Sequence, residues 1–175
     1  MICCEKPRSP ALEFRMLASL LHTYALNLGY ARKLVADLRP DQMALQPAAG
    51  MNHPAWVLGH LALTADMLGG MLGCEPLCPP EWQTLFGMDS TPGDDPAAYP
   101  SRDELLTTLE KAHTAIAAAV ERLPEDRWGE PTPLEAVRGF LPTFGDAIVF
   151  VTTSHEMMHL GQLSAWRRVA GLPRV

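Results

Sequence analysis

The sequence lacks three features that would each assign it to a particular class of protein. Its 175 residues carry a net charge of −6 without clustered lysines and arginines, so it has no basic face for nucleic-acid phosphates. It has no uninterrupted apolar run of about 18 residues that could span a membrane. The start, MICCEKPRSP, is too polar for a signal peptide. We therefore expect a cytoplasmic protein with no nucleic-acid partner and no membrane partner.

Alternating runs of valine, isoleucine and threonine, which β-strands need, are absent as well. Apolar residues instead recur every three or four positions, the period of an amphipathic helix. Four segments show this pattern: 12–38, whose inward stripe includes Met16, then 54–72, 101–123 and 143–170. Pro54 suits a first helical turn, and Ser101 with Glu104 forms a capping box. The pattern predicts an all-α protein, a four-helix bundle.

The length suits a single domain over residues 1–175, with its core between about residues 11 and 171. The connections 74–100 and 124–142 are rich in proline, and each is long enough to run back along a helix. We expect both to be long crossover connections, between helices 2 and 3 and between helices 3 and 4. Trp82, Leu85 and Phe86 lie at helical spacing and predict a short helical turn within the first connection.

The clearest chemical pattern is His155-Glu156-Met157-Met158-His159, which matches the H-E-x-x-H of zinc peptidases. The two histidines lie one turn apart on the apolar face of the last helix, so their imidazoles can share one metal ion. A peptidase would need a third ligand further along, and no acid or histidine follows His159. We therefore expect the third ligand upstream, and we expect Glu156 to be a solvent-exposed carboxylate at the rim of the site.

Four upstream histidines are candidates for the third ligand: His22, His53, His60 and His113. His53 suits a helix cap beside Pro54, and His22 and His113 suit the boundary of the core. His60 takes the place of an aliphatic residue in the stripe of 54–72. Together with His155 and His159 it would form a set with open coordination positions, as in catalytic metal sites. The alternative for any one of them is a core histidine with hydrogen-bond partners.

Several further residues are candidates for the surroundings of the metal. Gln162 follows His159 on the same face and suits a hydrogen bond to a ligand or a place at the core edge. Trp56, Thr64 and Trp166 are candidates for the pocket wall, and the two tryptophans suit ordinary core positions equally. Arg167 and Arg168 suit a helix C-terminus, where they complement the dipole.

The cysteines are expected to be free thiols in a reducing compartment rather than a disulfide framework. The alternative is a thiolate zinc site, for which their spacing is loose. The four are Cys3, Cys4, Cys74 and Cys78.

The stretches HPAWVLGHLALTADML, PEWQTLFG and HEMMHLGQLSAWRRVAGLP resemble the DinB/YfiT-like superfamily of four-helix-bundle metalloenzymes. The likeness covers nearly the whole chain. Its most specific part is H-x-x-x-H-x-G-Q-L followed by an arginine pair, together with one histidine on the second helix. The resemblance implies a divalent metal, Zn, Ni or Fe, bound by His60, His155 and His159.

Characterised members of the family that this chain resembles are thiol S-transferases and a thiol-dependent isomerase, and others are hydrolase-like. The resemblance therefore implies a transferase that uses a low-molecular-weight thiol as co-substrate and attacks a small-molecule substrate. Two alternatives stay open. One is a metal-dependent hydrolase with a metal-bound water, and the other is a non-catalytic bundle that binds a metal or ligand or pairs with itself as a homodimer.

Overall fold

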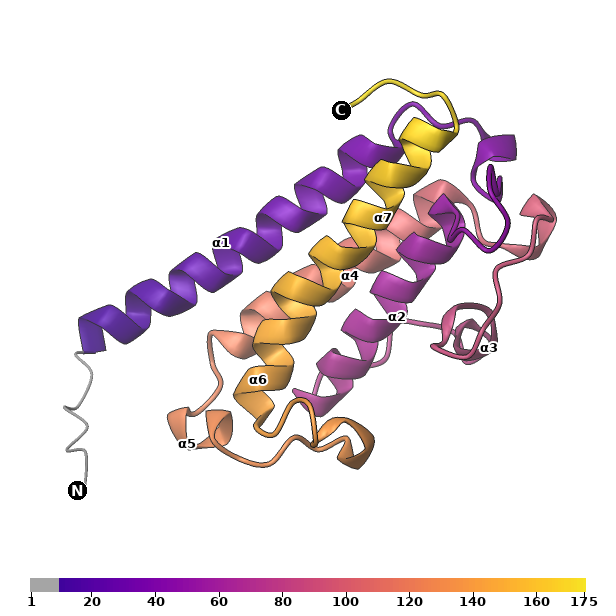
Figure 1. Cartoon of the computed structure of the whole chain (residues 1–175). Coiled ribbons are helices and arrows are strands. Elements are labelled where there is room, and N and C mark those ends of the chain that lie inside the picture. The colour runs from indigo at the N-terminus through magenta and orange to yellow at the C-terminus, as the bar shows by residue number, and fades with distance from the viewer. Residues whose placement is uncertain (1–9) are drawn as a thin grey trace.

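The computed structural model describes residues 10–175, and this range is helical, with no strand. Four long helical segments lie side by side (Figure 1). They are α1 (Pro10–Val35), α2 (Pro54–Met71), α4 (Arg102–Val120) and a continuous run made of α6 (Phe144–Val149), the π-helical turn η4 (Phe150–His155) and α7 (Glu156–Val169). The all-α prediction is confirmed, and each predicted helix is found within a few residues of its expected ends.

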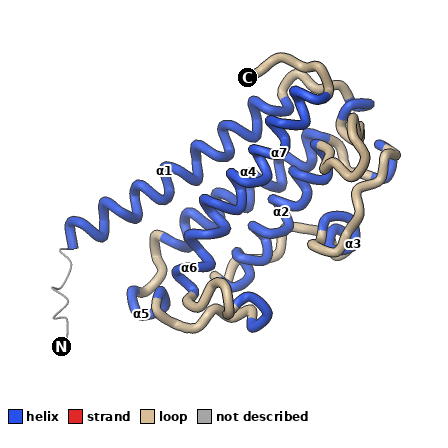
Figure 2. Tube along the Cα trace, viewed as in Figure 1, coloured by secondary structure: helices blue, strands red, loops and turns tan. Residues whose placement is uncertain are grey.

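Short helices and loops make up the connections between the long helices (Figure 2). They are η1 (Pro40–Gln42), α3 (Trp82–Phe86), η2 (Pro96–Ala98), α5 (Glu125–Trp128) and η3 (Glu135–Val137). The short helix predicted from Trp82, Leu85 and Phe86 is α3, and its two large aromatic side chains are buried. Among residues 10–175, no helix combines the length and apolar character that crossing a bilayer requires.

Side-chain caps start the helices that carry the centre of the fold. His53 caps α2, because its Nδ1 accepts the Trp56 backbone N–H at 3.1 Å, and Pro54 follows in the first turn. Ser101 caps α4, where its Oγ accepts the Glu104 backbone N–H at 3.2 Å. Both predicted helix starts are confirmed, whereas of the predicted capping box only the bond to Ser101 Oγ is present.

The core surrounds α2, which packs against α3, α4 and α7 and is buried over most of its length. The N-terminal end of α1 behaves differently, because α1 extends past the other helices (Figure 1). Phe14 and Met16 are 73% and 53% exposed there. The prediction that Met16 points into the core is therefore wrong: the stripe is present, but no neighbouring helix of the described chain reaches far enough to cover it.

Candidate metal centre

The structure brings together three histidines that are distant in the sequence. His60 comes from the middle of α2, His155 ends the π-helical turn η4, and His159 lies in the first turn of α7. Each offers one ring nitrogen, and the three nitrogens lie within 4.8 Å of one another. All three side chains are buried. These residues could therefore hold one metal ion.

Two of the three rings are held in a defined tautomer by an oxygen acceptor. His60 Nδ1 lies 2.7 Å from the Phe86 carbonyl oxygen, and His159 Nδ1 lies 3.1 Å from Gln162 Oε1. That same Oε1 accepts a hydrogen bond from Asn52 Nδ2 at 3.2 Å. Because an oxygen acceptor requires N–H, both rings carry their proton on Nδ1 and keep a lone pair on Nε2.

His155 completes this arrangement in a way that fits a metal ion. Its Nε2 lies 3.2 Å from His60 Nε2, and its Nδ1 is buried without a hydrogen-bond partner in the described chain. Since His60 Nε2 carries a lone pair and no proton, His155 Nε2 is the donor of the hydrogen bond between the two rings. The Nε2 lone pairs of His60 and His159 and the Nε2–H of His155 thus lie close together. His155 becomes a third ligand when its proton moves from Nε2 to Nδ1, and the three Nε2 lone pairs can then hold one cation.

Burial keeps the three rings neutral at physiological pH. It lowers the pKa of His155 to about 3, with further lowering from His159 and His60. It lowers the pKa of His159 to about 4, against a smaller opposing effect of the hydrogen bond to Gln162. The pKa of His60 is also lowered by burial, opposed by the Phe86 carbonyl. Neutral imidazole is the form that coordinates metals, so the rings are ready to bind at neutral pH.

Of the four residues expected around the metal, two contact the histidines. Gln162 contacts His159 as described, and the Trp56 ring stacks on His60 at 4.6 Å between centroids and 8° between planes. Trp166 is buried in the core, where its indole N–H donates to the Leu45 carbonyl. Thr64 is half-buried and makes no side-chain hydrogen bond within residues 10–175.

Glu156 is not at a solvent-exposed rim, so that prediction is wrong. Its side chain is 3% exposed, and its Oε1 lies 2.7 Å from His113 Nε2. His113 is itself buried and stacks on Tyr24 at 3.6 Å between ring centroids, so the boundary position expected for it is also wrong. Burial raises the pKa of Glu156, while the hydrogen bond and charge of His113 oppose the rise. The carboxylate therefore lies against His113 of α4 and near Asn27 of α1.

Arg167 lies in the last turn of α7, as expected, but its side chain is buried, which was not expected. This residue is 2% exposed, and its guanidinium donates to the Leu34 carbonyl at 2.8 Å, to Asp37 Oδ2 at 2.9 Å and to the Pro173 carbonyl. Besides lying at the helix end, its guanidinium links α7 to the end of α1 and to the C-terminal tail by hydrogen bonds. Arg168 is exposed in the last turn of α7, as expected there.

The cysteines of the described chain are free and half-buried, as expected for Cys74 and Cys78. Burial, with the nearby Asp66 carboxylate, raises the pKa of the Cys78 thiol to about 12. Neither cysteine belongs to the group of side chains in the described chain that could share one metal ion, which is His60, His155 and His159. Cys3 and Cys4 lie outside the described residues.

Sequence reasoning missed one residue that holds the centre together. Asn27 of α1 is 1% exposed, and its Nδ2 lies 3.3 Å from the carbonyl oxygens of Thr152 and of Thr153. These carbonyls belong to η4, the turn that ends at His155. A π-helical turn leaves the ordinary helical hydrogen-bond register, and such turns are frequent at functional sites. A polar residue within the apolar stripe of 12–38 was the available signal.

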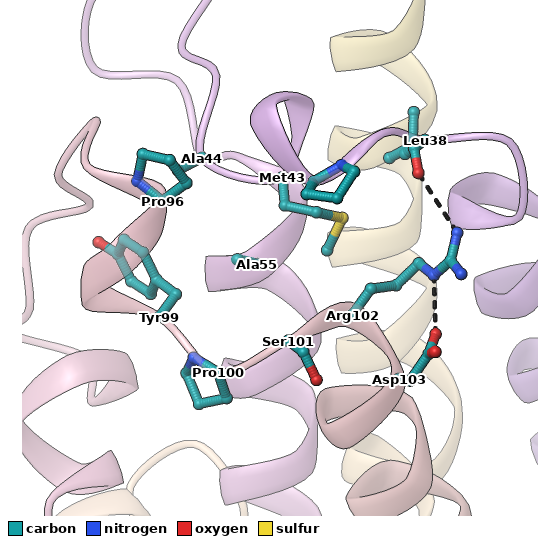
Figure 3. A pocket seen from close by; sticks show the side chains of 11 residues that line it. Leu38, Met43, Ala44, Ala55, Pro96, Tyr99, Pro100, Ser101, Arg102 and Asp103 are labelled. Carbon is teal, nitrogen blue, oxygen red and sulfur yellow. Dashed lines mark hydrogen bonds and ion pairs between the residues drawn. The ribbon is translucent and has the colours of Figure 1, made fainter.

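A separate pocket lies between the end of α1, the start of α2 and the start of α4. It is a cavity of about 250 Å³, and none of the three histidines lines it. Figure 3 shows Arg102 at its edge, directed to the Leu38 carbonyl and to Asp103. Because the Arg102 guanidinium already has these partners, this pocket offers no free cation to a ligand.

Comparison with known proteins agrees with this geometry. The model of the DinB superfamily matches residues 24–163, a range that includes all three histidines. A search of the curated proteins found no match. Among solved structures, the crystal structure of a conserved protein from Enterococcus faecalis is similar with a TM-score of 0.68 and 17% identity. The alignment covers 87% of this chain and 95% of that one, and at this identity it shows a shared fold.

Proposed function

The chain belongs to the DinB superfamily, and from that membership and its histidine cluster we propose that it is a metal-dependent thiol S-transferase. The observation that carries the proposal is the convergence of three neutral imidazoles on one place. We assign His60, His155 and His159 as the ligands of one divalent metal ion. Nitrogen ligands without carboxylates suit Zn, Ni and Fe.

The chemistry follows from the ligand set and from its surroundings. A divalent metal with three imidazole ligands and an open position is a Lewis acid that lowers the pKa of a bound thiol or water. Gln162 and the Phe86 carbonyl keep the protons of His159 and His60 on Nδ1, so that Nε2 stays available for the ion. Trp56 covers one side of His60 with an apolar ring and limits the access of water there.

The position of Glu156 favours a thiol over water as the nucleophile. A hydrolase usually pairs its water with a general base within hydrogen-bond reach. Glu156 is the carboxylate next to the ligands in sequence, and it is hydrogen-bonded to His113 instead. A thiol is more acidic than water and needs less help to lose its proton. In the proposed reaction the thiolate sulfur attacks an electrophilic carbon, a C–S bond forms, and the leaving group departs with the bonding electron pair.

We further interpret the scaffold as a four-helix bundle in which the connections 74–100 and 124–142 are crossovers. Their length and the neighbouring positions of α2 and α4 support this interpretation. We also propose a cytoplasmic location, supported by the free thiols of Cys74 and Cys78.

The proposal is tested with purified protein, metal-loaded and chelator-treated, and a bimane halide as electrophile. Glutathione, bacillithiol, mycothiol, coenzyme A and cysteine are offered in parallel, and esters and amides are offered without thiol. We expect turnover that needs both the ion and one preferred thiol. His60→Ala, His155→Ala and His159→Ala should each lose the metal and the activity, whereas His22→Ala, on the exposed face of α1, should keep about one ion per chain.

Other outcomes would contradict the proposal in recognisable ways. Turnover of esters or amides without thiol would favour the hydrolase alternative, with a pH profile set by bound water. Normal folding and metal content without any turnover would favour a binding protein. Full metal retention in His155→Ala would show that the assignment of the three histidines as ligands is wrong.

A further inference from the structure

Gly59, the residue before His60, lies in the interior of α2 where glycine destabilises a helix relative to alanine. Its backbone is not in the left-handed region, so the need for glycine is one of space. A Cβ built at position 59 would lie 2.4 to 2.5 Å from three atoms of the Phe86 ring. The other two glycines inside α2 are not crowded: Gly69 has its nearest neighbour at 3.6 Å, and Gly70 has none within 4 Å.

The close approach at Gly59 has a chemical result at His60. With its ring seated on the backbone of α2, Phe86 presents its carbonyl oxygen to His60 Nδ1 at 2.7 Å. Phe86 ends α3, where a carbonyl has no partner within its own helix and is free for such a bond. Trp82, one turn earlier, packs edge-on against the Phe86 ring at 5.2 Å and is also buried.

A second set of hydrogen bonds links the connection 74–100 to the histidine cluster. The Trp56 indole N–H donates to Ser90 Oγ at 2.8 Å, and Ser90 Oγ donates to the Gly87 carbonyl at 2.7 Å. Trp56 in turn stacks on His60. The segment from α3 to Ser90 therefore contacts the His60 ring through a hydrogen bond on its edge and through Trp56 on its face.

We propose that Gly59 and α3 position the metal ligand His60: the missing side chain at residue 59 lets α3 approach until the Phe86 carbonyl fixes the Nδ1–H tautomer. The inference rests on the proposed metal site and adds the residues that prepare His60 for it. An ordinary side chain at residue 59 would displace α3, and His60 would then be free to carry its proton on Nε2, the atom that must bind the ion. Outer-sphere partners of this kind typically change metal affinity by about 10- to 100-fold.

The test compares Gly59→Ala with the matched control Gly70→Ala, which adds the same methyl group to the same helix at an uncrowded position. A third variant, Gly59→Ala with Phe86→Leu, makes room for the methyl group and keeps the backbone carbonyl. Zinc affinity is measured by competition with a chelating dye. The His60 tautomer is read in metal-free protein from long-range ¹H–¹⁵N correlations of the imidazole nitrogens, a signature that a general loss of stability does not produce.

We expect Nδ1–H at His60 in the wild type, and in Gly59→Ala a mixture of tautomers with zinc binding weaker by about 10- to 100-fold. Gly70→Ala should stay within about twofold of wild type, and the double variant should recover most of the loss. Nε2–H at His60 in the wild type, or wild-type zinc affinity in folded Gly59→Ala, would overturn the inference. If Gly59→Ala does not fold, the wild-type tautomer and the double variant decide. If the wild type binds no metal, the proposed function fails, and the tautomer measurement still decides this inference.

Discussion

The buried histidines of this chain differ in what their ring nitrogens contact, and this difference separates their roles. His60 and His159 place an N–H on an oxygen and leave the other nitrogen to the cluster. His53 instead uses Nδ1 to cap α2, and His113 uses Nε2 to bind Glu156. Burial alone therefore does not identify a candidate ligand; for His60 and His159 the direction of the remaining lone pair does.

At the residue scale, His53 gives a prediction about pH. Burial lowers its pKa to about 4, and His155 and His159 are lowered to about 3 and about 4. An unfolded chain protonates these rings near pH 6.5, so between about pH 6.5 and 4 it binds more protons than the folded chain. The free energy of unfolding of metal-free protein should be fully present above pH 6.5 and fall below it, by up to about 1.4 kcal/mol per pH unit for each ring.

The contribution of His53 can be isolated with His53→Asn, since asparagine keeps the cap and does not titrate. Urea unfolding of metal-free protein at pH 7, 6 and 5 should show a smaller pH dependence in His53→Asn, by about one proton. Ser19→Ala, at an exposed position without a titratable group, should keep the wild-type dependence. Equal slopes in His53→Asn and wild type would mean that His53 is not held neutral by the fold.

Glu156 gives a second prediction at this scale. Glu156→Gln should keep about one metal ion per chain and most of the activity, because the carboxylate faces His113 and not the ligands. Glu156→Leu should lower the free energy of unfolding by about 3 kcal/mol, since it leaves a buried histidine without its partner. His113→Phe combined with Glu156→Leu should recover part of this loss. A thousandfold drop in activity of metal-loaded, stable Glu156→Gln would restore a general-base role.

At the scale of elements, the π-helical turn η4 joins α6 to α7 and ends at a ligand. The carbonyls of Thr152 and Thr153 accept hydrogen bonds from Asn27, which reaches across from α1. Helix α1 contributes none of the three histidines, but through Asn27 it supports the backbone of η4, which positions His155. The same logic applies to α3, whose Phe86 carbonyl acts on His60 from outside α2.

Asn27→Leu should remove both hydrogen bonds at similar side-chain volume. We expect the free energy of unfolding to fall by about 1 to 2 kcal/mol, because a buried amide loses two hydrogen bonds to the carbonyls of η4. Amide exchange over residues 150–156 should accelerate, and zinc affinity should fall about tenfold, as for other outer-sphere changes. Ser19→Ala, at an exposed position of α1, is the control. Faster exchange with unchanged zinc affinity would show that η4 does not position His155.

At the scale of the whole molecule, Arg167 connects parts of the chain that are far apart in sequence. From α7 it reaches the Leu34 carbonyl near the end of α1, Asp37 beyond it and the Pro173 carbonyl in the C-terminal tail. Asp37 has its pKa lowered, first by its hydrogen bond to Arg167. The guanidinium therefore joins α7, the end of α1 and the C-terminal tail at one end of the fold.

Arg167→Met should keep the apolar stem and lose these bonds, and we expect the free energy of unfolding to fall by about 3 kcal/mol. The neighbouring Arg168→Met is the control, since Arg168 is exposed, and it should change stability by less than about 0.5 kcal/mol. Thermal and urea unfolding of the two variants at neutral pH test this. Similar losses in both variants would indicate that the exchange of a helix residue, rather than the buried bonds, sets the cost.

The local pattern of the sequence was enough to predict the long helices and the pairing of two histidines on the last one. Periodicity predicted the four long helices. The cap at His53 and the proline at position 54 are local signals for the start of α2. The spacing of His155 and His159 placed both rings on one helix face. These features depend on residues within one or two turns of each other. The resemblance to a known family then pointed to His60, and the structure places it beside the other two.

Only the tertiary structure decided how these faces meet. Periodicity indicates that a side chain points inward but not which helix it contacts. The sequence therefore did not predict the buried pair of Glu156 with His113 or the buried hydrogen bonds of Arg167. Asn27 binds backbone carbonyls of η4, and His60 binds the backbone carbonyl of Phe86. Backbone groups are the same in every residue, so the sequence gives no signal for these two contacts. Such contacts join residues many positions apart, and packing selects them because a buried polar group without a partner costs about 1 to 3 kcal/mol.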